Sequence, residues 1–265
     1  MTIRPILHHI PVCPFSQRLE ILLDLKQGRE QVEFREVDIT RPRDEELLRR
    51  TRGRTSLPVL ELGDGRMLRE SLVILGYFDS LFPDPPIART DPWERAVEQL
   101  VCAQEGPLTQ RGFALGMNQD PERRASLLDS LLAIYRELDA LLVEHATGSP
   151  FLFDRFGWAE VVFTPLFQRF WFLEHYEDFR LPAEPAYARV QEWVDACLSH
   201  PAAAQVSAEQ VVKLYHDYAF GVGNGTLAPG RLRSSFVLEP HWRDRPWPAR
   251  GKQGPPATDA DLGLL

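Results

Sequence analysis

The stretch ILHHIPVCPFSQRLEILLDLK, residues 6–26, decides how this chain begins to fold. Its first residues are a short apolar run typical of a strand, and the leucines after Pro14 recur with the spacing of one apolar helix face. Proline is favoured as the first residue of a helix, which places Cys13 at the N-cap position. The stretch therefore predicts a strand that leads directly into a helix, with a cysteine at the junction.

Cys13 is a candidate nucleophile because of this position. Backbone N–H groups at a helix N-terminus lack helical partners, and together with the positive end of the helix dipole they favour thiolate over thiol. The structural alternative is a small buried residue near a strand end. Cys102 and Cys197 fall inside predicted helices, where such donors are absent, so we expect them to be structural.

Cysteine number and spacing also limit the kind of protein. Three widely spaced cysteines form neither a disulfide framework nor a CxxC metal half-site. This pattern fits a reduced, cytoplasmic compartment and predicts no metal site.

Outward from the first helix, the N-terminal region alternates strand and helix signals. We expect a strand at 31–39, a helix at 44–51, a hairpin around the GDG turn at 63–65, and an amphipathic helix at 71–82. The predicted element order over residues 1–82 is βαβαββα.

A proline-rich segment divides the chain. Residues 83–92, PDPPIARTDP, tolerate neither a helix nor a central strand. From there the periodicity is helical, with helices expected at 93–117 (kinked at Pro107), 121–146, 158–176, 185–199 and 207–219. We therefore predict an all-α domain at 92–220, followed by a Gly/Pro/Arg-rich extension at 221–265 that packs on the body.

Composition excludes several classes of protein. With 265 residues, 44% of them hydrophobic, the chain is too apolar to be disordered, and its net charge of −8 argues against nucleic acid as a partner. Charged residues interrupt every apolar run before it reaches the length of a membrane span. The N-terminal residues show no pattern of a secretory signal.

Three motifs resemble the cysteine-type (omega-like) glutathione transferases: CPFS at 13–16, SLPV at 56–59 and Glu70-Ser71. Further stretches are similar to the glutathione lyases of bacterial lignin β-aryl-ether breakdown, among them HHIPVCPFSQR, SPFLFDRFGWAEVVFTPLF, GVGNG and ATDADLGL. The resemblance implies the soluble glutathione transferase fold, which joins a thioredoxin-like glutathione-binding domain to an α-helical substrate domain. It also implies glutathione as co-substrate and a homodimer.

The same resemblance implies a set of glutathione-binding residues. The backbone of Leu57, before a cis Pro58, would hold the cysteinyl part, while Glu70 and Ser71 would hold the γ-glutamyl end. Arg41 and Arg43 are either partners of the glycine carboxylate or a solvated charge run. The full set implied to bind glutathione is Pro14, Phe15, Leu57, Pro58, Glu70 and Ser71.

Ser16 occupies the place where glutaredoxins have a second cysteine, so a mixed disulfide at Cys13 has to be resolved by a second glutathione. In the lyases, a tyrosine at the position of Tyr215 faces the site, where its phenol could donate to a substrate carbonyl oxygen; packing of an aromatic stripe is the alternative. The resemblance thus implies removal of glutathione from an aromatic α-keto thioether.

Other activities share these residues. A general thiol transferase or dehydroascorbate reductase, and a glutathionyl-hydroquinone reductase, would also use Cys13. Chloride-channel-like proteins open their first helix with a similar motif and insert into membranes, but Arg18, Glu20 and Asp24 make such insertion of this helix costly.

Overall fold

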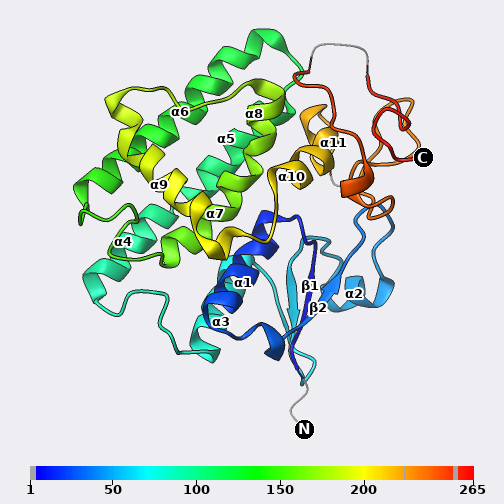
Figure 1. The fold of residues 1–265 in the computed structure, drawn as a ribbon. Helices are drawn as coiled ribbons and strands as arrows, with labels where there is room; N and C mark the ends of the chain where they lie inside the picture. Colours follow the sequence, from blue (N-terminus) through cyan, green and yellow to red (C-terminus); the bar gives the residue numbers. More distant parts are fainter. Residues whose placement is uncertain (1–3, 224, 253–255) are drawn as a thin grey trace.

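The computed structural model describes residues 4–223, 225–252 and 256–265, so Asn224 of the GVGNG stretch lies outside the described residues. Figure 1 shows a small sheet with helices α1–α3 at one end of the molecule and a larger helical region beside it. The N-terminal elements are β1 (Ile6–His9), α1 (Pro14–Leu25), β2 (Glu33–Glu36), α2 (Glu45–Arg50), β3 (Val59–Glu61), β4 (Met67–Leu68) and α3 (Ser71–Leu81).

The sheet has the strand order β2-β1-β3-β4. Strand β1 pairs in parallel with β2 and antiparallel with β3, and β3 pairs antiparallel with β4. The GDG turn closes the predicted hairpin, with Gly65 at a φ of +85° that favours glycine. This arrangement confirms the predicted thioredoxin-like fold.

Helix α1 is buried more completely than its sequence suggests. Leu19, Leu22 and Leu23 are fully buried, as the apolar stripe predicts, but Gln17 and Arg18 are buried too. The reason is that α1 packs against α3 on one side and against α7 on the other. The apolar face is therefore buried as expected, and the polar face is buried as well because the second domain covers it.

The helical region confirms the all-α prediction but divides three of the expected helices. Its elements are α4 (Pro92–Cys102), α5 (Glu105–Met117), α6 (Pro121–Glu144), α7 (Trp158–Arg169), α8 (Trp171–Glu177), α9 (Ala188–Ser199), α10 (Ala208–Leu214) and α11 (His216–Ala219). The expected kink at Pro107 is a break, since Pro107 has no N–H for the carbonyl of Ala103. Further breaks fall at Phe170 and Tyr215, and the first turn of the helix expected at 185–199 is a 3₁₀ turn, Pro185–Tyr187.

Helix α7 begins with half of a capping box, since Gly157 at the N-cap has no side chain. The N–H of Gly157 donates to Glu160 Oε2 at 2.8 Å. Glu160 Oε1 accepts from Leu152 N at 2.8 Å and from Trp193 Nε1 at 2.7 Å. One buried carboxylate thus joins the start of α7 to the preceding loop and to α9.

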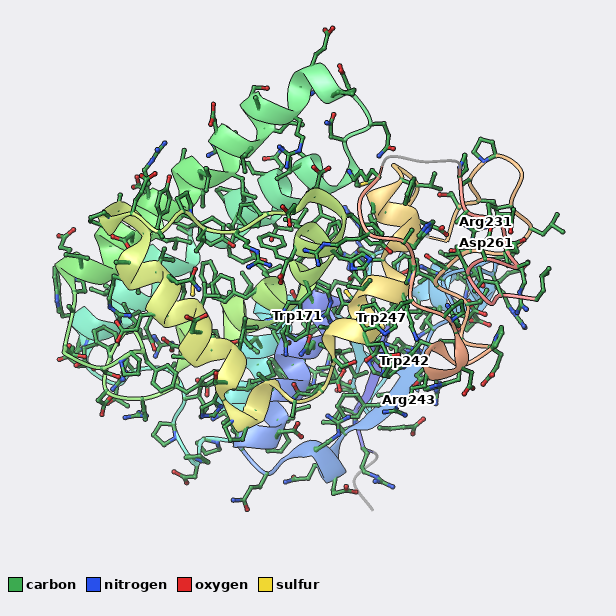
Figure 2. All side chains as sticks on the ribbon, turned by 45° about the horizontal axis from the view of Figure 1, so that its top comes forward. Trp171, Arg231, Trp242, Arg243, Trp247 and Asp261 are labelled. Carbon is green, nitrogen blue, oxygen red and sulfur yellow. The ribbon has the colours of Figure 1, made fainter. Side chains whose placement is uncertain are left out.

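The C-terminal extension lies along α10 and α11. Figure 2 shows Trp242 and Trp247 beside this part of the molecule, where Lys213 Nζ donates to the carbonyl of Trp242 at 3.1 Å and lies 5.8 Å from the ring centre of Trp247. The apolar side chains of Phe236 and Leu264 are buried.

Asp217 on α11 holds the extension through buried polar contacts. It accepts hydrogen bonds from Ser235 N at 2.7 Å and Ser234 Oγ at 3.0 Å, and it pairs with Arg231 at 3.4 Å. Burial acts to raise the pKa of Asp217, but the hydrogen bonds from His216, Ser235 and Ser234 and the Arg231 charge together lower it.

No helix in the described part of the chain is long and apolar enough to cross a membrane.

Candidate active site

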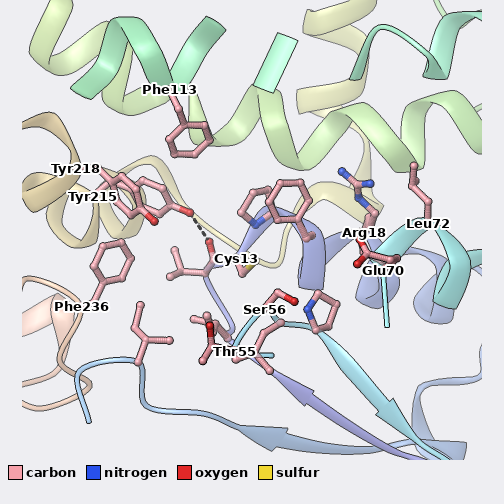
Figure 3. Close-up of a pocket in the computed structure, with 18 of the residues that line it drawn as sticks. Cys13, Arg18, Thr55, Ser56, Glu70, Leu72, Phe113, Tyr215, Tyr218 and Phe236 are labelled. Carbon is pink, nitrogen blue, oxygen red and sulfur yellow. Dashed lines mark hydrogen bonds between the residues drawn. The ribbon is translucent and has the colours of Figure 1, made fainter. Parts of the chain in front are cut away.

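A cavity of about 820 Å³ lies where the N-terminal elements meet α5, the α10–α11 junction and the extension. Figure 3 shows Cys13 near the middle of the view, with Tyr215, Tyr218 and Phe236 on one side, Glu70 on the other, and Ser56 and Thr55 below it. The cavity therefore brings together the β1–α1 junction and residues more than 200 positions downstream.

Cys13 occupies the N-cap of α1, as predicted, with φ −77° and ψ 127°. Its N–H donates to the carbonyl of Ile10 at 2.9 Å, and its own carbonyl accepts from Gln17 N at 3.0 Å. The thiol accepts no capping hydrogen bond from the first turn, and Cys13 lines the cavity instead. A half-buried, free thiol is thus exposed to a substrate.

The other two cysteines are placed differently. Cys102 ends α4 and Cys197 is fully buried in α9, and burial raises the pKa of both thiols. Neither lines the cavity. Ser16 is fully buried next to Cys13, where it accepts from Ile10 N at 3.4 Å. Cys13 is therefore the one cysteine at the cavity among the described residues.

The residues expected to bind glutathione line the same cavity. The Leu57–Pro58 peptide is cis, as expected, and leads into β3. Glu70 is the N-cap residue of α3 and has a positive φ of 67°, an unusual conformation for a side chain other than glycine. Ser71 is the first helical residue of α3.

Three arginines bring positive charge to the cavity wall. Arg18 on α1 donates to Glu105 on α5 at 2.6 Å, so this buried pair is internally compensated. Arg41 is exposed and pairs with Asp38. Arg43 lines the cavity, and its buried Nε has no hydrogen-bond partner among the described residues. Burial lowers the pKa of Arg43, although the nearby Asp38 charge acts to raise it. Arg43 is therefore better placed than Arg41 to meet a bound carboxylate.

An aromatic wall of Phe113, Tyr215, Tyr218 and Phe236 lines the cavity beside Cys13. Ring centres of Tyr215, Tyr218 and Phe236 lie 5.3–5.4 Å apart, and Phe113 of α5 lies 5.5 Å from Tyr218. Of this group, only Tyr215 was predicted from the sequence to face the site. Phe113 lies within a regular helix pattern, and Phe236 lies in an irregular segment without periodicity, so neither gave a distinguishing signal.

Tyr215 sits at the junction of α10 and α11 rather than inside one helix. Its hydroxyl donates to the carbonyl of Val12 at 3.0 Å, the dashed contact in Figure 3. Burial raises the pKa of Tyr215, so the phenol stays protonated at neutral pH. The phenol thus lies next to Cys13, but in this structure its proton is engaged by the backbone.

His8 and His9 lie on β1, and each faces a carboxylate. His8 Nε2 lies 3.2 Å from Glu61, and His9 Nδ1 lies 3.5 Å from Glu20. Neither histidine lines the cavity. The part of the chain that the structure describes contains no group of three or more His, Cys, Asp or Glu that could hold a metal.

Comparison with known proteins gives two domain matches. Residues 7–86 match the family described as glutathione S-transferase, N-terminal domain, and residues 121–196 match glutathione S-transferase, C-terminal domain. The probable glutathione transferase omega-2 of Caenorhabditis briggsae is 26% identical over 229 residues, which cover 82% of this chain and 87% of that protein.

Solved structures share the fold. Rice GST1 (OsGSTU1), solved in complex with glutathione, matches with a TM-score of 0.70 at 25% identity, covering 83% of this chain and 98% of that chain. TDR1 of Leishmania, a trimeric glutathione transferase, matches with a TM-score of 0.71 at 22% identity; 81% of this chain is covered, but only 48% of that longer chain.

Proposed function

Because this chain belongs to the glutathione S-transferase family, whose co-substrate is glutathione, we propose that it removes glutathione from an aromatic thioether. The sulfur-bearing carbon of this substrate is α to an aryl ketone. Such conjugates arise in lignin β-aryl-ether breakdown, the setting that the sequence resemblance implies. Omega-type relatives are consistent with glutathione-dependent thiol chemistry at a cysteine.

The reaction consists of two exchanges at sulfur. The Cys13 thiolate attacks the glutathione sulfur, a Cys13–glutathione disulfide forms, and the carbon–sulfur bond breaks. The electron pair of that bond remains on carbon as the enolate of the ketone, which then takes up a proton. A second glutathione thiolate attacks the mixed disulfide, releases the Cys13 thiolate and leaves as oxidised glutathione. The carbon is reduced by two electrons, and two glutathione sulfurs are oxidised.

The observation that carries the proposal is the position of Cys13, the cavity's one cysteine among the described residues, beside an aromatic wall that includes a buried phenol. Phe113, Tyr218 and Phe236 offer flat apolar surfaces to an aryl group. The residues that would hold glutathione line the same cavity: Pro14, Phe15, Leu57, Pro58, Glu70 and Ser71.

We assign Tyr215 the task of stabilising the leaving enolate. Its hydroxyl lies at the carbonyl of Val12, immediately before the attacking cysteine. As negative charge develops on the substrate oxygen, a charged acceptor becomes a stronger partner than the neutral backbone carbonyl. The hydroxyl then exchanges Val12 for the enolate oxygen.

The deciding experiment compares two substrates. S-phenacylglutathione tests carbon–sulfur cleavage, and a small mixed disulfide of glutathione tests thiol transfer; both are followed by the oxidised glutathione released. We expect turnover of the phenacyl conjugate that is abolished in C13S. Disulfide reduction without phenacyl turnover would assign the protein to the thiol transferases, the second candidate, which needs Cys13 and the glutathione residues but not Tyr215.

The remaining alternatives are tested separately. Activity on glutathionyl-hydroquinone or dehydroascorbate would broaden the substrate range. Binding to liposomes at acid pH would support the chloride-channel-like alternative. Against it stand the ion pairs of Arg18 with Glu105 and of Glu20 with Arg29, which insertion of α1 would break.

We also propose a homodimer in the cytoplasm. Large apolar side chains are exposed on two neighbouring stretches, Leu72 and Val73 on α3 and Trp93 and Leu100 on α4. Sedimentation equilibrium tests this: W93E should weaken the dimer, and a wild-type protein that is monomeric at micromolar concentration would refute it.

A further inference from the structure

Arg169, the last residue of α7, is fully buried and forms no ion pair with a carboxylate among the described residues. Arginine cannot lose its proton under ordinary conditions, so the buried charge is permanent. An uncompensated charge in a protein interior is costly, and such groups are normally paired. Arg18, the other large buried arginine near the cavity, follows this rule by pairing with Glu105.

The guanidinium of Arg169 is held by neutral acceptors next to the cavity. Its Nε donates to the carbonyl of Val12 at 2.6 Å and its Nη2 donates to Gln17 Oε1 at 2.7 Å. Its Nη1 is buried and has no hydrogen-bond partner among the described residues. The guanidinium carbon lies 6.0 Å from the ring centre of Tyr215.

The Val12 carbonyl therefore accepts from two donors, Arg169 and Tyr215. Val12 directly precedes Cys13 in the chain. The charged Arg169 is therefore hydrogen-bonded to the residue next to the candidate nucleophile. The Arg169 charge and Cys13 both act on the phenol of Tyr215, since they shift its pKa in opposite directions. Arg169 is thus joined to the residue before Cys13 through the same carbonyl that accepts from Tyr215.

We propose that Arg169 is a positioning residue whose uncompensated charge stabilises the anions formed at this site, first the Cys13 thiolate and then the leaving enolate. The proposal rests on the proposed role of Cys13 as nucleophile. Arg169 does not line the cavity, so it acts through field and backbone rather than by touching the substrate.

The shared carbonyl gives Arg169 a second role. When the hydroxyl of Tyr215 turns to the substrate oxygen, the Val12 carbonyl would become an unsatisfied buried acceptor if it had no other donor. Arg169 still donates to this carbonyl after the Tyr215 hydroxyl has turned away. Tyr215 can therefore bind the substrate oxygen without leaving a buried acceptor unsatisfied.

Other charges around Cys13 do not replace Arg169. The ionisable groups lining the cavity are Arg18, Arg41, Arg43, Glu70, Glu105, Tyr215 and Tyr218. Of the cations in this set, Arg18 is neutralised by Glu105, Arg41 is solvent-exposed beside Asp38, and Arg43 lies in the loop after β2.

Charged groups on α7, α4 and α10 have partners other than Arg169. On α7 itself, Glu160 lies nine residues from Arg169, about 13 Å along the axis, and bonds Trp193. Glu98 on α4 accepts from the N–H of Arg89, and Lys213 on α10 pairs with Glu209.

The test is the pH profile of Cys13 alkylation by iodoacetamide, followed by mass spectrometry of the peptide that contains Cys13. An opposite charge close to an ionisable group shifts its titration by about one pH unit or more. We therefore expect R169Q to move the inflection upward by about that amount, whereas R169K keeps it within a few tenths. A histidine is neutral above about pH 7, so the alkylation profile of R169H should resemble that of R169Q. R169H is the variant to use if R169Q does not fold.

R189Q is the matched control. Arg189 on α9 is also largely buried and donates to the carbonyls of Ser149 and Pro150, but it pairs with Glu192 at 3.4 Å and does not line the cavity. R189Q should lower the melting temperature but leave the pH profile of Cys13 alkylation unchanged. An unchanged inflection in a folded neutral variant of Arg169 would overturn the proposal. Alkylation measures the reactivity of Cys13 itself and needs no substrate turnover. A failure of the Arg169 proposal is therefore distinct from a failure of the proposed reaction, which is tested by comparing turnover of S-phenacylglutathione in the wild type and C13S.

Discussion

Replacement of Tyr215 by phenylalanine tests the enolate mechanism most directly. An oxyanion donor contributes about 10²–10³ to the rate. Here the hydroxyl must first give up its 3.0 Å hydrogen bond to Val12, a neutral bond with a net value of about 1 kcal/mol, or about fivefold in rate. We therefore expect Y215F to slow turnover of S-phenacylglutathione about 20- to 200-fold.

The same substitution should spare folding and disulfide exchange. The Val12 carbonyl keeps its hydrogen bond from Arg169, so the loss of stability should be about 1 kcal/mol. Reduction of a mixed disulfide releases a thiolate and involves no enolate, so its rate should change by less than about threefold. The assay measures initial rates of oxidised glutathione release for both substrates, with the melting temperature as a control. Equal slowing of both substrates would remove Tyr215 from the mechanism.

Three further predictions concern separate parts of the molecule. C13S should lose nearly all turnover while C102S and C197S retain it, because only Cys13 among them lines the cavity; comparable loss in either of the others would contradict the assignment. E70Q should weaken glutathione binding in calorimetry while Cys13 alkylation stays unchanged, and undiminished affinity would exclude a role for this carboxylate. The pKa of Asp217 is lowered in the folded state, so its stabilisation is present above the unfolded value of about 3.9 and is lost as pH falls below it. D217N should accordingly lower the melting temperature at pH 7, and this effect should shrink as pH falls below about 3.9; an effect that does not change with pH would show that the charge is unimportant.

Local sequence signals predicted much of the N-terminal region because local physics decides it. Pro14 after Cys13 marks a helix start, and the GDG turn marks a hairpin, whatever packs around them. The long stripe of α6 likewise predicted that helix to within two residues of its end at Glu144. These elements are specified by residues close to one another in the chain.

The remaining features depend on contacts between distant segments. The breaks at Phe170 and Tyr215 interrupt patterns that are helical on both sides, so periodicity alone does not reveal them. Phe236 reaches the cavity only because Asp217, about twenty residues earlier, anchors the extension. Arg169 stands 157 residues from the carbonyl that it shares with Tyr215. No local pattern could have predicted these contacts.

The extension and the phenol are connected through one short helix. Asp217, which holds the extension, lies two residues after Tyr215 and one before Tyr218, and the anchored segment supplies Phe236 to the same aromatic wall. A shift of α11 would therefore displace the phenol and the surface for the aryl group together. Disulfide exchange requires neither, since its leaving group is a thiolate. The proposed reaction on an aryl ketone conjugate should therefore depend on the contacts by which Asp217 anchors the extension, whereas disulfide exchange should not.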